Sequence, residues 1–183
     1  MSHLILRSKL RLRNAVKALG DAAVGAATIA MLRTTRFFDP VKTADRFGRA
    51  LRYIGPKLRE DRIGRENLKA AFPEKSPEEI EKILTGVWDN LGRIGAEFAH
   101  LDHIWDYDIN CPEKSRVEIP QRTHELFAQL KNDGKPALIF ASHLGNWELP
   151  ALAAVAHGLD AAILCRRPNS QSAYRAIEKI RAV

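Results

Sequence analysis

A long helix with a defined start is the feature that most limits the fold of this chain. The stretch "SPEE", residues 76–79, places serine at an N-cap, proline at the first helical position and glutamate at the third, which is the pattern of a capping box. Apolar residues then recur at helical spacing over about six turns: Ile80, Ile83, Leu84, Val87, Leu91, Ile94, Phe98 and Leu101. Such a helix buries its apolar face, so the sequence predicts a packed helical layer. Two shorter helices are expected before it, at residues 61–72 and within the proline-containing loop 38–56.

A different rhythm begins after residue 113. Two short apolar runs, 137–141 and 161–165, alternate with helical patterns at 121–131, 148–157 and 171–182. An apolar run of this length between turn residues is typical of a strand that is covered on both faces. We therefore predict an α/β fold, in which an N-terminal helical region precedes alternating helices and strands of a mostly parallel sheet.

Positive charge is concentrated at the front of the chain. Residues 1–70 hold 16 Lys and Arg against 6 Asp and Glu, whereas residues 71–183 hold 13 against 16. This asymmetry predicts an anionic partner for the N-terminal part: nucleic acid, an acidic protein or a negatively charged membrane. We expect no nucleic acid, because neither a recognition helix nor an aromatic-interleaved basic surface is apparent.

Residues 1–35 are a candidate membrane anchor, ahead of residues 36–183, which we expect to be the N-terminal part of one domain. Residues 1–20 mix leucines with arginines and lysines, as basic amphipathic segments at membrane surfaces do, and residues 22–32 carry no charge. A spanning helix needs about 20 apolar residues, so this run is short. The alternatives are an ordinary buried helix and a cleaved signal sequence, whose apolar centre would begin late.

The cysteines and the paired histidines do not indicate a metal site. Cys111 and Cys165 form no C-x-x-C pair, so neither a disulfide framework nor a zinc pattern follows, and a reducing, cytoplasm-facing location is favoured. His100 and His103 stand three residues apart, a spacing that metal ligands use, but no third ligand is evident. We therefore expect no metal and no cofactor.

His143 and Glu148 stand where the first predicted strand gives way to a helix. Ligands of parallel sheets bind beyond the carboxyl ends of strands, a position that Arg166 and Arg167 share. A neutral imidazole accepts a proton near pH 7, and a carboxylate on its other nitrogen fixes the tautomer and stabilises the imidazolium. Because no serine or cysteine nucleophile has motif support, the pair would activate a hydroxyl of a bound substrate. On spacing alone, a catalytic pair and a structural pair remain open.

Four stretches of the sequence resemble blocks of one enzyme family. "SHLGNWE", residues 142–148, resembles the H-x4-D/E block of glycerolipid acyltransferases, in the form found in the lauroyl and myristoyl transferases of lipid A biosynthesis. "ENLKAAFPEKSPEEIEKI", "NLGRIGAEF" and "CRRPNS" are similar to three further blocks of the lipid A family. The resemblance covers most of the chain from about residue 63 onward.

This resemblance implies an O-acyltransferase of lipopolysaccharide biosynthesis, which moves a fatty acyl chain from acyl carrier protein to a hydroxyl of a lipid A precursor. His143 would be the general base, and Glu148 would orient it and stabilise its charge. Arg167 would hold a phosphate or position the substrate, with Arg166 beside it in place of the family's usual tyrosine. Gly145 and Asn146, the remaining candidate substrate-binding residues, would shape the turn.

The resemblance also implies a location and partners. The location would be the cytoplasmic face of an inner membrane, and the partners would be acyl carrier protein, a phosphorylated glycolipid acceptor and the membrane surface. Family members continue beyond the last residue of this sequence, so we expect a sheet that is incomplete at the C-terminus. Two alternatives stay open: an acyltransferase for another glycolipid or a lysophospholipid, and an inactive membrane-associated fragment.

Overall fold

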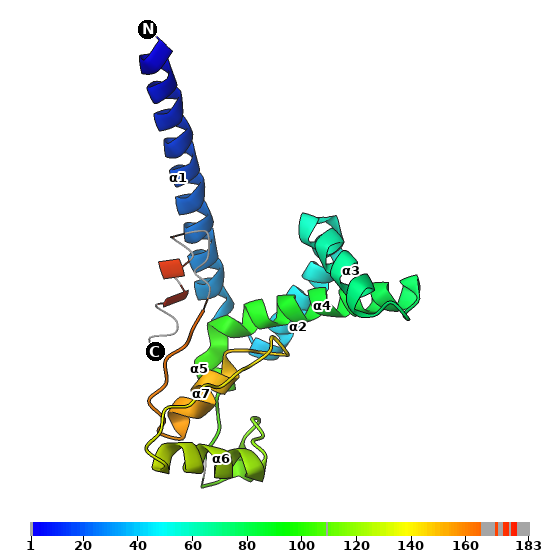
Figure 1. Ribbon diagram of the computed structural model, residues 1–183, viewed down its shortest axis with the longest axis vertical. Helices are drawn as coiled ribbons and strands as arrows, with labels where there is room; N and C mark the ends of the chain where they lie inside the picture. Colours follow the sequence, from blue (N-terminus) through cyan, green and yellow to red (C-terminus); the bar gives the residue numbers. More distant parts are fainter. Residues whose placement is uncertain (1, 109, 166–170, 172–173, 176, 179–183) are drawn as a thin grey trace. The chain divides into compact units, whose positions relative to one another are not determined.

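A computed structural model describes residues 2–108, 110–165, 171, 174, 175, 177 and 178; side chains are described from residue 10 onward, residues 11 and 12 excepted. The chain divides into two compact units, residues 1–37 with 164–183, and residues 38–163. Within the described residues, every element of secondary structure is a helix, and no strand is formed (Figure 1).

The first unit contains one long helix, α1 (Ser2–Thr35). Within it, Arg13–Thr35 is 23 residues long and contains an 18-residue window with a mean hydropathy of 1.5, which is long and apolar enough to cross a membrane. A signal sequence or a buried core helix passes the same test of length and composition. A membrane anchor therefore remains one candidate role for α1.

The second unit is a succession of helices joined by short turns and by one long irregular segment. In chain order the elements are α2 (Pro40–Ile54), the 3-10 turn η1 (Gly55–Lys57), α3 (Arg59–Ala71), α4 (Pro77–Glu97), η2 (Phe98–His100), α5 (Leu101–Ile104), η3 (Pro112–Lys114), α6 (Gln121–Asn132) and α7 (Leu149–Ala156). Helix α2 runs along α4, and α3 also packs on α4 (Figure 1).

Helix α4 confirms the predicted capping box. The Ser76 hydroxyl accepts a hydrogen bond from the Glu79 backbone N–H at 3.2 Å, and a Glu79 carboxylate oxygen accepts one from the Ser76 N–H at 2.8 Å. These bonds satisfy two backbone donors that the first turn leaves without helical partners. The Ser76 N–H, with Lys75 nearby, lowers the pKa of the Glu79 carboxyl.

The buried face of α4 differs slightly from the predicted stripe. Val87 and Leu91, which the stripe included, are exposed on the surface of α4. Five of the six buried positions follow the i, i+4 row, and the sixth is Ile94 of the predicted stripe. The row consists of Ile80, Leu84, Trp88, Gly92 and Ala96. This row is one of the side-chain ridges by which helices pack, and it faces α2 and α3.

Glycines allow α2 and α4 to approach closely. A side-chain carbon on Gly92 would collide with the Phe47 backbone, and one on Gly48 would lie 2.6 Å from a carboxylate oxygen of Asp89. Gly55 is equally constrained, because a side chain there would enter the Trp88 ring. The helix pair thus depends on the absence of side chains at three positions.

Buried and half-buried polar contacts tie the three helices together. The Trp88 indole N–H donates to the Asp61 carboxylate at 2.8 Å, and Arg65 donates to the other oxygen of Asp61 at 2.6 Å. Asp61 is only 5% exposed, so these partners satisfy a carboxylate that burial would otherwise penalise. Arg93 joins Asp45 of α2 to Asp89 of α4 at 2.6 and 2.8 Å, and both carboxylates raise its pKa.

The predicted α/β fold is wrong for the part of the chain that the structure describes. Neither residues 137–141 nor residues 161–165 form a strand, and all ten residues are exposed. A strand satisfies its backbone only through a neighbouring strand, whereas a helix satisfies its own, so these runs needed long-range partners that the described residues do not provide. The sheet that we expected to be incomplete at the C-terminus is therefore absent from the described residues.

Most of the predicted helices are confirmed, unlike the strands. Residues 61–72, 76–101, 121–131 and 148–157 correspond to α3, to α4 with η2 and α5, to α6 and to α7. The short helix expected within 38–56 is instead the fifteen-residue α2, which begins with Pro40 after Asp39 accepts a hydrogen bond from the Lys42 N–H at 2.8 Å. The helix expected at 171–182 lies largely outside the described residues.

Candidate active site

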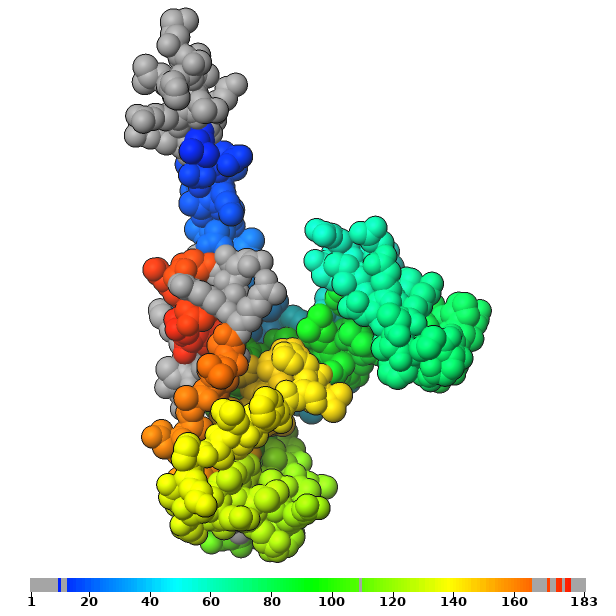
Figure 2. Space-filling model, in the orientation of Figure 1, coloured from blue at the N-terminus to red at the C-terminus, as the bar shows by residue number. Residues whose placement is uncertain are grey.

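The block 142–148 forms an irregular turn that enters α7. Every residue from 131 to 145 is exposed, and this yellow segment lies open on the face seen in Figure 2. Gly145 has a φ of +60°, a left-handed backbone that glycine adopts without strain. No neighbouring atom crowds this glycine, so its role is backbone conformation and not close packing.

Asn146 connects this turn to the long helix α4. Its side-chain amide donates to Glu97, the last residue of α4, at 3.0 Å. Its side-chain oxygen accepts from the Glu148 backbone N–H at 3.1 Å, and its backbone carbonyl accepts from Leu149 at 3.3 Å. One residue thus holds the turn against α4 and also satisfies donors at the beginning of α7.

Glu148 is the N-cap residue of α7 and is 6% exposed. Its carbonyl accepts from the Leu152 N–H at 3.3 Å, and its side chain does not cap the helix. A carboxylate at a helix N-terminus gains from the partial positive charge of the first turn. The predicted glutamate is therefore an inward-facing group at the start of α7.

His143 lies on the exposed side of the same turn. Its ring contacts the indole of Trp147, with centroids 4.9 Å apart and planes tilted by 40°. Among the described residues, no hydrogen bond joins the His143 imidazole to the Glu148 carboxylate. The turn therefore groups Asn146 with Glu148, and His143 with Trp147, while Arg166 and Arg167 lie outside the described residues.

Glu97 is the residue of this site that motif reasoning missed. It ends α4 and supplies the acceptor for Asn146, forty-nine residues later in the chain. It lies in "NLGRIGAEF", a stretch that resembles the family. The carboxylate in that stretch was the sequence signal that could have identified it as a site residue. Its significance became visible only when the turn was placed beside α4.

A second polar cluster links α6 to α7 behind the same region. The Tyr107 hydroxyl lies 2.7 Å from His124 Nε2, His124 Nδ1 lies 2.8 Å from His157 Nε2, and His157 Nδ1 lies 2.7 Å from the Ala153 carbonyl. Because that carbonyl can only accept, His157 Nδ1 donates; with neutral rings, each bond then runs from Tyr107 toward Ala153. The ring of Phe127 contacts that of His157, with centroids 4.7 Å apart and planes tilted by 37°. The cluster fixes the end of α7, and the sequence offered no pattern for it.

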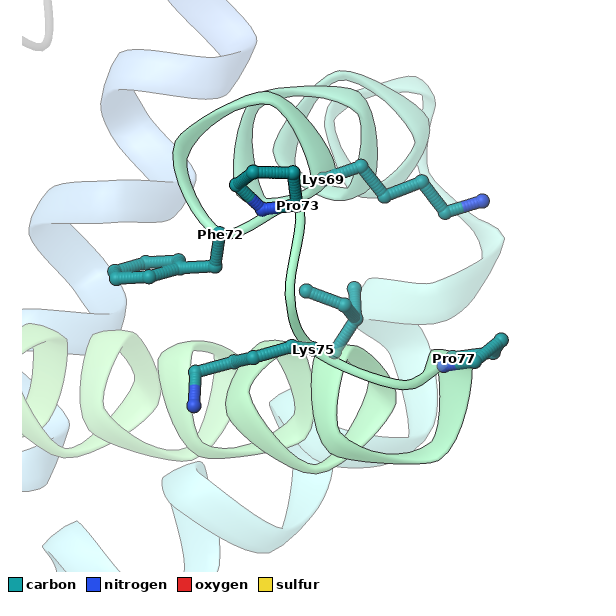
Figure 3. Close-up of a pocket in the computed structure, with 6 residues that line it drawn as sticks. Lys69, Phe72, Pro73, Lys75 and Pro77 are labelled. Carbon is teal, nitrogen blue, oxygen red and sulfur yellow. The ribbon is translucent and has the colours of Figure 1, made fainter.

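A hollow at the turn between α3 and α4 is unrelated to this site. Its walls are Lys69, Phe72, Pro73, Lys75, Pro77 and Ile80 (Figure 3). Figure 3 shows the side chains of Lys69 and Lys75 extending to opposite sides, so their ammonium groups do not converge on one anion. Within the described residues, no three His, Cys, Asp or Glu side chains gather in a way that could hold a metal ion.

Comparison with known proteins defines the class to which this chain belongs. A family model for bacterial lipid A biosynthesis acyltransferases matches residues 13–183, a span that includes the whole turn 142–148. No curated protein and no solved structure matches the chain. The chain therefore belongs to the bacterial lipid A biosynthesis acyltransferase family, and the resemblance seen in the sequence is confirmed. This family makes it an acyltransferase of lipopolysaccharide biosynthesis, in a membrane-associated group of enzymes.

Proposed function

We propose that this protein transfers a fatty acyl chain from acyl carrier protein to a hydroxyl of a phosphorylated lipid A precursor. The observation that supports the proposal is the turn 142–148, which carries a family-type H-x4-E block and is held to α4 by Asn146. The front-loaded positive charge of the chain suits both an acidic carrier protein and an anionic glycolipid. No bound cofactor or metal is needed for this transfer.

In the proposed reaction, His143 acts as the general base. Its neutral imidazole takes the proton of the acceptor hydroxyl while that oxygen attacks the thioester carbonyl of the donor. The carbon–sulfur bond then breaks, the new ester remains on the acceptor, and the carrier thiolate leaves and takes up the proton from the imidazolium. The atoms balance without any enzyme nucleophile.

Glu148 has the role of a positioning residue in this proposal. A carboxylate that bonds the second imidazole nitrogen selects the tautomer and stabilises the imidazolium. His143 and Glu148 are not bonded in the described structure, but catalytic hydrogen bonds often tighten only when substrate is bound. Gly145, between them, supplies the backbone freedom for that change.

The remaining parts of the chain complete the proposed arrangement. Arg167 would bind a phosphate of the acceptor, with Arg166 beside it, since guanidinium groups match phosphate oxygens geometrically. Residues 1–35 would anchor the domain 36–183 to the cytoplasmic face of the inner membrane. Both substrates of the reaction would then meet at that surface.

The test measures transfer of labelled acyl groups in a membrane preparation that contains the full chain. Acyl–acyl carrier protein and a lipid A precursor are supplied, and mass spectrometry identifies the acylated product. We expect His143→Ala to reduce the rate about 100-fold or more, as loss of a general base does. His103→Ala, which removes another exposed histidine, is the matched control and should keep the wild-type rate.

Three results would count against the proposal. Equal rates for wild type and His143→Ala would remove His143 from the chemistry. Transfer to a lysophospholipid or another glycolipid, and not to the lipid A precursor, would assign a different acceptor. A wild-type chain that binds vesicles but transfers nothing to any of these acceptors would be an inactive membrane-associated protein.

A further inference from the structure

Helix α2 has one face that packs on α4 and one that stays exposed. Its buried residues are Thr43, Ala44 and Gly48. On the opposite side, residues at i, i+4, i+7 and i+11 form a continuous line along the helix: Lys42, Arg46, Arg49 and Tyr53, all of them exposed. This side of α2 is therefore available to a partner outside the second unit.

The charged residues of this line are all cations, and the neighbouring carboxylates have other partners. Asp39 accepts a hydrogen bond from the Lys42 backbone N–H at 2.8 Å. Asp45 pairs with Arg93, and Asp89 pairs with both Arg93 and Arg52. Among the described residues, Lys42, Arg46, Arg49 and Lys57 make no ion pair. We call these four cations, together with Tyr53, the basic face of α2; Lys57 stands in η1, directly after the helix.

Tyr53 joins Lys57 to the part of the basic face that lies on α2. The Lys57 ammonium lies 3.6 Å from the centroid of the Tyr53 ring, which is close enough for a cation–π contact. Tyr53 is itself exposed, so its ring presents apolar surface between charges. Tyrosine rings of this amphipathic kind are enriched where proteins meet the headgroup region of membranes.

Only a short connection separates α1 from α2 along the chain. The candidate membrane span ends at Thr35, and α2 begins at Pro40, so the connection reaches at most about 18 Å at the extended length per residue. Phe37 and Phe38 stand in this connection, and Phe37 is 86% exposed. A cationic helix that follows an apolar helix by so short a link is typical of a segment that lies on an anionic bilayer.

We propose that the basic face of α2 docks on the anionic phospholipid headgroups of the bilayer that holds α1. This inference rests on the membrane anchor in the proposed function and adds a second, electrostatic contact to it. An acidic protein would also match the charge, but Tyr53 and the two phenylalanines near the end of α1 favour a lipid surface. The contact would restrain the second unit at the membrane, where a lipid acceptor is found.

The test uses lysine reactivity in the full chain, reconstituted into nanodiscs. One set of discs contains phosphatidylcholine alone, and the other contains equal parts of phosphatidylcholine and phosphatidylglycerol. A neutral acetylating reagent and mass spectrometry report the modification rate of each lysine. We expect the anionic discs to slow Lys42 and Lys57 at least threefold and to leave Lys69 and Lys82 unchanged. About 0.5 M salt should restore the rates, because it shortens the Debye length to a few ångströms.

Two charge-matched variants separate the basic face from net charge. Lys42→Gln/Arg46→Gln/Arg49→Gln removes three cations of the basic face and should abolish the protection of Lys57. Arg62→Gln/Lys69→Gln/Lys82→Gln removes three exposed cations from α3 and α4 and should leave that protection intact. All six side chains are on the surface, so both variants keep the packed helices.

Several outcomes would overturn the inference. Equal rates for Lys42 and Lys57 in the two kinds of disc would show that α2 does not touch the headgroups. Protection by added acyl carrier protein in phosphatidylcholine discs, without any effect of phosphatidylglycerol, would make the basic face a protein-docking site. A chain that enters no disc of either kind would overturn the membrane anchor as well, which distinguishes the two failures.

Discussion

The helix pair α2 and α4 and the segment between α6 and α7 belong to one unit but differ in the burial of their apolar residues. In the helix pair, Ile80 is 1% exposed and glycines allow the backbones to touch. In the segment, Leu138 is 80% and Phe140 91% exposed. A helix satisfies its own backbone and needs only one partner face, whereas an apolar strand needs neighbours on both edges and covers on both faces. The difference shows that the apolar faces of helices, and not the apolar runs predicted to be strands, are packed within this unit.

The largest expected effect contrasts two apolar side chains, one from each region. Ile80→Ala should reduce the free energy of unfolding by about 3 kcal/mol, because it leaves a cavity in the packed layer. Phe140→Ala should change it by less than about 0.5 kcal/mol, because the ring is already exposed. Urea unfolding of the full chain in detergent, followed by circular dichroism, gives both values. A similar loss for the two variants would mean that the segment is packed as tightly as the helices.

The second prediction contrasts two glycines of α4. Gly92→Ala should cost about 1–3 kcal/mol of stability, since the new methyl group meets the Phe47 backbone at the crossing with α2. Gly95→Ala has open space around it and should stabilise the protein by about 0.5–1 kcal/mol through helix propensity. The same unfolding measurement applies. A stabilised Gly92→Ala variant would show that the two helices do not cross so closely.

The third prediction concerns the bond that joins the two regions. Asn146→Ala removes the hydrogen bonds to Glu97 and to the Glu148 N–H, and should cost about 1 kcal/mol. Amide hydrogen exchange at residues 143–150 should accelerate correspondingly. Glu97→Gln keeps an acceptor oxygen for Asn146 and should retain most of the protection. Unchanged exchange in Asn146→Ala would mean that the turn is held by other contacts.

The smallest expected effect is the pH response of the loop before α6. Asp106 accepts hydrogen bonds from the Arg116 side chain and from the backbone N–H groups of Arg116 and Val117, and the Arg116 side chain lowers its pKa most. Since the folded pKa is depressed, this stabilisation is complete above the usual value of 3.8 and is lost as pH falls through the folded value.

Amide signals of Arg116 and Val117 should therefore shift together in an acid titration followed by nuclear magnetic resonance. The midpoint should lie below 3.8, and Asp106→Asn should abolish the transition. A midpoint above 3.8 would mean that Arg116 does not hold the carboxylate.

Local signals in the sequence predicted much of the helical part. The capping box at Ser76 was readable because a helix end is decided by a few adjacent residues. The block 142–148 was readable for another reason, since its residue types resemble a known family. The turn at Gly145 and the helix after it followed from the same stretch.

The contacts between distant residues were not readable in this way. Nothing in the sequence paired Asn146 with Glu97, Asp61 with Trp88, or Tyr107 with His124. The predicted strands failed for the same reason, because a strand depends on partners that the local pattern does not name. The length of α2 was underestimated where prolines suggested a loop, although Pro40 stands at a position that helices favour.

The sequence by itself determined where α4 begins, where positive charge gathers, and which family motif the chain carries. Each of these depends on residue type and on spacings of one to five residues, at which backbone and side chains meet directly. Only the tertiary structure decided that Gly48 and Gly92 mark a close helix crossing, that Asn146 ties the candidate site to α4, and that the apolar runs stay exposed. Those outcomes depend on which distant surfaces meet, and burial of a side chain is a property of both surfaces together.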